Sequence, residues 1–192
     1  MARRAFHLMR VIATSLIQLG RNDEALVEIE RARELDPNSS SILADRARIL
    51  WITGSREEAL QLLKQLEAAE PNFTSPHRYL KAAYLEMRDY PNYLAEMRKE
   101  ALLTGDASML AEAEAAAKGF GRGGEREMLS NELSVQARLY GQGKLSPYVL
   151  AGTEARLGNT RETLKYLALS VESHDESALG FSGEPGFCQT PG

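Results

Sequence analysis

The amino-acid sequence predicts an all-α fold, a right-handed α-solenoid of about five antiparallel helix pairs with an irregular C-terminal capping segment. A repeat period between about 20 and 50 residues is typical of solenoids, in which each repeat buries its apolar face only against its neighbours. The residue types also fit a helix–turn–helix unit, and no run with strand periodicity is evident. The period itself is carried by three pairs of residues, each 34 positions apart in one register: Gly20 and Gly54, Ala25 and Ala59, Pro37 and Pro71.

The first repeat covers about residues 6–39. Gly20 is expected to end its first helix, and Pro37 to end the second, because proline lacks a donor and restricts the residue before it. Apolar residues recur at helical spacing in both helices and predict one buried face. These residues are Phe6, Met9, Ile12, Ala13 and Leu16 in the first helix, and Ala25, Leu26, Ile29, Ala32 and Leu35 in the second.

The second repeat, about residues 40–73, has the same layout. Large and small apolar residues precede Gly54, and a second set precedes Pro71. Together, the two repeats resemble the tetratricopeptide repeat, whose pattern alternates large and small apolar residues around a turn glycine and ends on proline. The residues that carry the resemblance are Met9, Ala13, Leu16, Gly20, Ala25, Ile29, Ala32 and Pro37 in the first repeat, and Leu43, Ala47, Leu50, Gly54, Ala59, Leu63 and Pro71 in the second.

The later repeats depart from this pattern. In the third repeat, about 74–107, the small residue of the first helix is replaced by Lys81 and the turn glycine by Arg88. The alanine of the second helix is replaced by Tyr93. The fourth, about 108–143, is expected to have a helix over 108–118, a turn over 119–124 and a second helix over 125–140. The fifth spans about 144–175. We therefore expect one repeat domain over residues 1–175 and a capping segment over 176–192.

Three short motifs outside the first two repeats point to a particular group of proteins that contain tetratricopeptide repeats. Gly121-Arg122-Gly123, Ser146-Pro147-Tyr148 and Glu184-Pro185-Gly186-Phe187 look like the C-terminal tetratricopeptide region of bacterial winged-helix transcriptional regulators and related signalling proteins. That resemblance implies that the chain is the sensor or effector portion of such a regulator, with the DNA-binding domain absent from this chain.

Composition and charge narrow the classes of function. The 192 residues carry 23 Lys and Arg against 27 Asp and Glu, and this balance argues against direct nucleic-acid binding. One cysteine, Cys188, excludes an internal disulfide or a cysteine-based metal cluster. No stretch approaches the roughly 20 apolar residues of a membrane span. We expect a cytoplasmic protein, or a periplasmic one if it is part of a membrane-anchored regulator.

No catalytic chemistry is predicted. Gly119, Gly121 and Gly124 satisfy the spacing of a dinucleotide-binding motif, but no strand precedes them, so an interhelix turn is the better interpretation. His7, His77 and His174 lie far apart in sequence and are interpreted as surface histidines rather than metal ligands. With no nucleophile–base pair evident, we expect a non-catalytic protein without a cofactor or metal.

The predicted function is protein–protein interaction. In tetratricopeptide arrays the first helix of each repeat lines a concave groove. Here that surface is expected to combine arginines with aromatic residues, a combination suited to binding an acidic or C-terminal peptide. An inner face that is merely solvated stays open as an alternative, and Trp51 also fits packing between repeats. The carboxylate clamp of chaperone-binding arrays is excluded by the residues at its positions. The candidate groove residues are His7, Arg10, Thr14, Gln18, Asp45, Arg48, Trp51, Arg78 and Tyr79.

Overall fold

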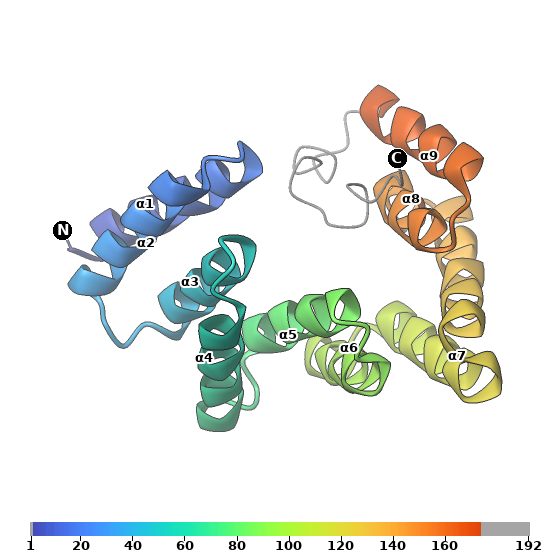
Figure 1. The fold of residues 1–192 in the computed structure, drawn as a ribbon, viewed down its shortest axis with the longest axis horizontal. Coiled ribbons are helices and arrows are strands. Elements are labelled where there is room, and N and C mark those ends of the chain that lie inside the picture. Colours follow the sequence, from blue (N-terminus) through green and yellow to red (C-terminus); the bar gives the residue numbers. More distant parts are fainter. Residues whose placement is uncertain (1, 174–192) are drawn as a thin grey trace. The chain divides into compact units, whose positions relative to one another are not determined.

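Helices are the only regular secondary structure in the described part of the chain. The computed structural model describes residues 2–173, with the side chains of residues 2–7 and 10 left out, and the predicted capping segment 176–192 lies outside the described residues. Within 2–173 there are nine helices and no strand (Figure 1), which confirms the all-α prediction. The helices are α1 (Ala2–Gln18), α2 (Asn22–Leu35), α3 (Ser40–Ile52), α4 (Arg56–Ala69), α5 (Thr74–Glu86), α6 (Tyr90–Thr104), α7 (Ala107–Gly141), α8 (Pro147–Arg156) and α9 (Thr160–Glu172).

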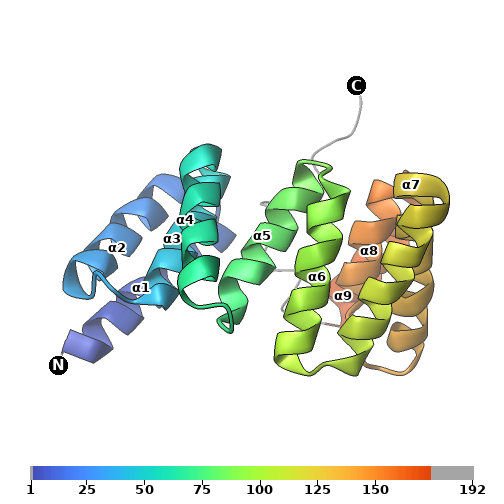
Figure 2. The ribbon, with the colours of Figure 1, turned by 90° about the horizontal axis from the view of Figure 1, so that it is seen from below.

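The chain forms two compact units, Met1–Asp89 and Tyr90–Gly192, which are described separately. In the first unit α1 pairs with α2 and α3 with α4, while α2 packs on α3 and α4 on α5 (Figure 2). Each helix pair thus buries its apolar face against the next pair, as a repeat array requires. One core cluster joins the first two repeats and consists of Ala13, Leu16, Ile17, Ala25, Ile29, Ala32, Ile42 and Ile49.

The 34-residue period reappears in the backbone hydrogen bonds that close the turn inside each repeat. The amide just beyond the turn bonds back to a carbonyl in the last turn of the preceding helix, and the residue before that amide has a positive φ. This is the arrangement that satisfies the carbonyls left over at a helix end. The bonds run from Arg21 N to Leu16 O (2.9 Å), from Ser55 N to Leu50 O (2.8 Å) and from Asp89 N to Tyr84 O (2.9 Å).

Arg88 stands at the third of these turns with a φ of 58°, the one positive φ of a non-glycine residue in the described part of the chain. A side chain in this left-handed region costs roughly 1 kcal/mol relative to glycine. The third repeat has therefore kept the turn although its sequence has lost the turn glycine.

We expect Arg88→Gly to stabilise the protein by up to about 1 kcal/mol, because glycine adopts the left-handed conformation without strain. Urea unfolding followed by circular dichroism measures the change. The matched control is Gly54→Ala at the same place in repeat two, where φ is 97° and an added Cβ would meet nothing within 4 Å. The control variant should lose a similar amount of unfolding free energy. A destabilised Arg88→Gly variant would contradict the left-handed conformation assigned to Arg88.

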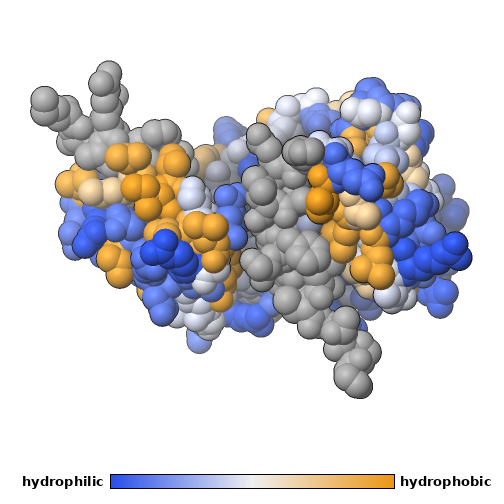
Figure 3. Space-filling view, turned by 90° about the horizontal axis from the view of Figure 1, so that it is seen from above, coloured by the Kyte–Doolittle hydropathy of each residue, from blue (hydrophilic) through white to orange (hydrophobic). Residues whose placement is uncertain are grey.

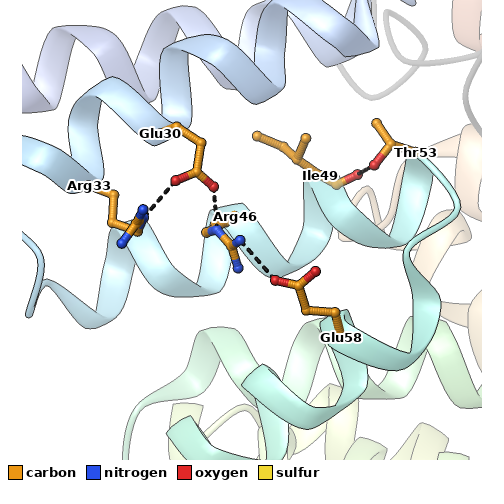
Figure 4. A network of polar contacts seen from close by, with 6 residues as sticks. All are labelled: Glu30, Arg33, Arg46, Ile49, Thr53 and Glu58. Atoms are coloured by element: carbon orange, nitrogen blue, oxygen red, sulfur yellow. Dashed lines mark hydrogen bonds and ion pairs between the residues drawn. The ribbon is translucent and has the colours of Figure 1, made fainter.

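A polar network ties the first two repeats together beside the core (Figure 4). Arg46 of α3 donates to Glu30 of α2 over 2.5 Å and to Glu58 of α4 over 2.9 Å, and Arg33 donates to the second oxygen of Glu30 over 2.6 Å. Partial burial raises the pKa of Glu30, but the hydrogen bonds from Arg46 and Arg33 outweigh it and hold that pKa below its usual value. The network therefore fixes how α2 lies against α3.

In the second compact unit, α6 packs on α7, α7 on α8, and α8 on α9. Helix α7 is two helices joined at a kink, where Gly123 and Gly124 have non-helical backbone angles. The prediction of a turn over residues 119–124 is therefore wrong in its bounds, because residues 119–122 are still helical. Gly119 is buried and faces the second half of α7: a Cβ there would lie 2.3 Å from the carbonyl oxygen of Glu127. This glycine serves close packing between two helical segments rather than the turn.

Candidate partner-binding surface

Helices α3 and α5 place the predicted groove residues of repeats two and three side by side. The Tyr79 hydroxyl on α5 donates to Asp45 Oδ1 on α3 over 2.7 Å, and these two residues are 34 positions apart. Asp45 is 5% exposed, so its carboxylate is a contact between repeats rather than an open ligand-binding group. Burial, together with the neighbouring charge of Asp45 and the hydrogen bond to it, raises the pKa of Tyr79 to about 12.

Arg48, one turn after Asp45, lies over the ring of Tyr79 with its Cζ atom 5.9 Å from the ring centroid. This distance is within the range of a cation–π contact. Among the described residues no carboxylate forms an ion pair with Arg48. Several other arginines of the same compact unit do pair with glutamates, namely Arg21, Arg31, Arg33, Arg46 and Arg56. Arg48 is thus held over an aromatic ring while its charge has no acidic partner in the described part of the chain.

Trp51 contacts Glu86 at the end of α5 and Arg56 at the start of α4. Its Nε1 donates to Glu86 Oε2 on α5 over 2.6 Å, and the Arg56 guanidinium lies 5.1 Å from its ring centroid. Arg56 also forms an ion pair with Glu86. Trp51 is half-buried by these contacts between repeats two and three.

Of the other candidate residues, Arg78 lies close enough to Tyr79 for its charge to act against the rise in the pKa of the Tyr79 hydroxyl. Thr14 donates to the Val11 carbonyl over 2.8 Å, within its own helix. Gln18 and Arg78 are exposed. The side chains of His7 and Arg10 lie outside the described residues. The structure therefore brings together Asp45, Arg48 and Tyr79, with Trp51 in a neighbouring cluster on the same two helices; we call these four residues the α3–α5 surface.

His77 is not a surface histidine, so that interpretation is wrong. It is 2% exposed, its Nε2 lies 3.1 Å from the Pro71 carbonyl oxygen, and its Nδ1 lies 3.8 Å from a Glu67 oxygen. The turn that ends α4 folds back over the start of α5 and buries the imidazole. His7 and His174 lie outside the part of the chain whose side chains are described.

Comparison with known proteins agrees with this architecture. Residues 16–84 match the family model of the tetratricopeptide repeat. Among solved structures, the chain resembles TTC0263, a thermophilic tetratricopeptide repeat protein of Thermus thermophilus, with a TM-score of 0.63, 21% identity, and 95% and 98% of the two chains covered. It also resembles a point mutant of MamA, with a TM-score of 0.51, 18% identity and 87% and 96% covered. A second MamA structure, from MSR-1, has a TM-score of 0.51 and 18% sequence identity, with 90% of this chain and 98% of the MamA chain covered.

The helix pairs, their turns and the family match define an α-helical repeat protein. More narrowly, residues 16–84 match the tetratricopeptide repeat, and the fold as a whole is similar to that of a tetratricopeptide repeat protein. The likeness to the solved structures, at identities of 21% and below, concerns the fold. No curated protein sequence matches the chain. Among residues 2–173, no helix combines the length and apolar character that crossing a membrane requires.

Proposed function

We propose that the chain is a non-catalytic scaffold that binds an acidic peptide or an acidic segment of a partner protein on its α3–α5 surface. The observation that carries the proposal is the Arg48 guanidinium, which lies over Tyr79 with its Cζ atom 5.9 Å from the ring centroid and has no acidic partner among the described residues. A fixed guanidinium can donate two parallel hydrogen bonds to a carboxylate, and the ring beneath it adds apolar contact area. Repeat arrays of this kind typically serve protein–protein interaction.

The surroundings of Arg48 support binding because they restrict how the surface can move. Tyr79 is held by Asp45, and Trp51 is held by Glu86 and covered by Arg56. Side chains that are already fixed lose less conformational entropy when a ligand arrives. The surface is therefore preorganised by contacts between repeats two and three. The partner is expected to meet arginine and aromatic side chains together, a combination that often dominates binding energy.

We expect Arg48→Ala to weaken binding of an acidic peptide by about ten- to a hundredfold, because a charge-assisted bidentate contact contributes on the order of 1.5–3 kcal/mol. The probe is an immobilised set of Glu- and Asp-rich peptides, each beside a matched Gln- and Asn-substituted version, with affinities of the best binders measured by calorimetry. Arg31→Ala is the control, since Arg31 is exposed on α2 and paired with Glu28. Equal binding of acidic and amide peptides, or an unaffected Arg48→Ala variant, would refute the proposal.

The finer prediction, that this array is the sensor or effector part of a bacterial transcriptional regulator, rests on the resemblance of short motifs. Of these, Ser146 accepts a hydrogen bond from the Tyr148 amide at the start of α8, and Glu184–Phe187 lies outside the described residues. An in-frame winged-helix coding region in the parent gene would support this role. A cytoplasmic location belongs to the same proposal.

A further inference from the structure

Two apolar surfaces lie on α1 and α9, the first and the last of the described helices. On α1 the N-terminal end face consists of Leu8, Val11 and Ile12, which are 59%, 43% and 39% exposed. On α9 the C-terminal end face consists of Leu164, Ala168 and Val171; Leu164 is 61% and Val171 70% exposed. Figure 3 shows apolar side chains gathered over the first two helices and, separately, over α9. Large exposed side chains gathered in this way are typical of interaction sites.

The repeat register shows what the N-terminal end face would meet. The residues that lie 34 positions after Leu8 and Ile12 are Ile42 and Arg46 on α3. Ile42 is fully buried in the core cluster, and Arg46 bonds to Glu30 of α2, so these positions face the second helix of the preceding repeat. One period later the corresponding residues Pro76 and Leu80 on α5 are also buried. On α1 the same positions are open and apolar.

The C-terminal end face occupies the matching positions of a second helix. Gly158 corresponds to Gly20, because both have a positive φ and the next amide bonds back to the preceding helix in the same way. In this register α9 aligns with α2, so that Leu164, Ala168 and Val171 correspond to Leu26, Glu30 and Arg33. That stripe of α2 faces α3, as the Glu30–Arg46 ion pair shows. The stripe of α9 is therefore the surface that a following repeat would cover.

The two end faces differ from the internal interface in a reciprocal way. Inside the array Glu30 and Arg46 meet as an ion pair. The register partners of these two residues at the ends are Ala168 and Ile12, so a charge has been replaced by an apolar side chain on each side. The register partners of Leu26 and Ile42 are Leu164 and Leu8, so this second pair of positions is apolar both inside the array and on the end faces. Both end faces are apolar where the internal interface has the Glu30–Arg46 ion pair, so the N-terminal and C-terminal end faces are complementary to each other.

We infer that copies of this chain associate head to tail, with α9 of one copy packed on α1 of the next and the internal helix-pair stacking continued across the contact. Such a contact joins unlike faces, so it leaves a free face of each kind and permits addition of further copies. Its stability derives from removing aliphatic side chains of both end faces from water. The inference does not depend on ligand binding at the α3–α5 surface.

The test is a charge swap in the 192-residue chain, with mass measured by sedimentation velocity and light scattering over a wide range of concentration. Ile12→Arg and Ala168→Glu should each weaken self-association at least about tenfold, because each buries one unpaired charge. The double variant carrying both should recover association to within about threefold of the unaltered chain, since it rebuilds the Glu30–Arg46 pair between copies. Val27→Glu, on an exposed apolar residue of α2 outside both end faces, is the control and should have no effect.

Several results would overturn the inference. A chain that stays monomeric at every concentration means that something else covers the faces, for example residues 174–192 on α9. Loss of association with Ile12→Arg but not with Ala168→Glu indicates symmetric pairing of two α1 helices. A double variant that fails to recover association shows that Ile12 and Ala168 do not meet. Circular dichroism of each variant confirms that the helices remain folded.

Discussion

Gly119→Ala is expected to destabilise the protein by about 3 kcal/mol, the largest effect of any single methyl group we predict. The added Cβ would lie 2.3 Å from the carbonyl oxygen of Glu127 and 2.9 Å from the Cα of Met128. Both are backbone atoms, so no side-chain rotation relieves the contact and the two halves of α7 must move apart. Overpacking of this kind typically costs about 1–3 kcal/mol and occasionally more. Urea unfolding followed by circular dichroism measures the loss.

Gly121→Ala is the matched control for this experiment. Gly121 is helical and only two residues away, and a Cβ there would meet nothing within 4 Å. Alanine in a helix is favoured over glycine by roughly 0.5–1 kcal/mol, so this variant should gain stability. If residues 119–124 formed a turn, as their glycine content predicts, the two substitutions would have similar effects. Similar stabilities would contradict the close approach of Gly119 to Glu127.

The second expected result concerns the hydrogen bond between Tyr79 and Asp45. Tyr79→Phe should lower the free energy of unfolding by about 2 kcal/mol at neutral pH, because a buried carboxylate loses a hydroxyl donor. Tyr166→Phe is the control, since the Tyr166 hydroxyl has no hydrogen bond within the described part of the chain. An unchanged stability of Tyr79→Phe would show that the contact between repeats two and three contributes nothing there.

The same pair predicts a pH dependence. The pKa of Tyr79 rises from an ordinary value of about 10 to about 12 on folding, so the unfolded chain ionises first. The stabilisation is therefore complete below about pH 10 and is lost between about pH 10 and 12, at about 1.4 kcal/mol per pH unit. Because phenylalanine does not ionise, the difference in unfolding free energy between the unaltered protein and Tyr79→Phe should shrink over that range. A constant difference would contradict the raised pKa.

The repeat architecture could be predicted from the sequence because its signals are local. A glycine at a turn, a proline after a helix and apolar residues at helical spacing act within a few positions of the chain. These signals recur 34 residues apart, and the closing hydrogen bonds at Arg21, Ser55 and Asp89 recur at the same spacing. Even Arg88, which breaks the sequence pattern, keeps the left-handed turn.

Some local signals were overridden by packing. Gly119 looks like a turn residue, yet it lies inside α7, where the second half of the helix approaches too closely for any side chain. Ser108 is of a residue type that often caps helices, but the Asp106 side chain accepts the hydrogen bonds at the start of α7. In the first case the close approach of Glu127 decides the role of Gly119, and in the second Asp106 is better placed than Ser108 to accept the hydrogen bonds. Neither outcome can be read from residue type alone.

The period, the helix pairs and the class of the fold are properties that the sequence by itself determined, because each depends on residues a few positions apart. Tertiary structure alone decided which groove residues meet. It engaged Asp45 and Trp51 in contacts between repeats, buried His77, and left Arg48 over Tyr79. The physical reason is that burial and side-chain pairing depend on groups brought together from neighbouring repeats, and their distances are set only when the helices pack.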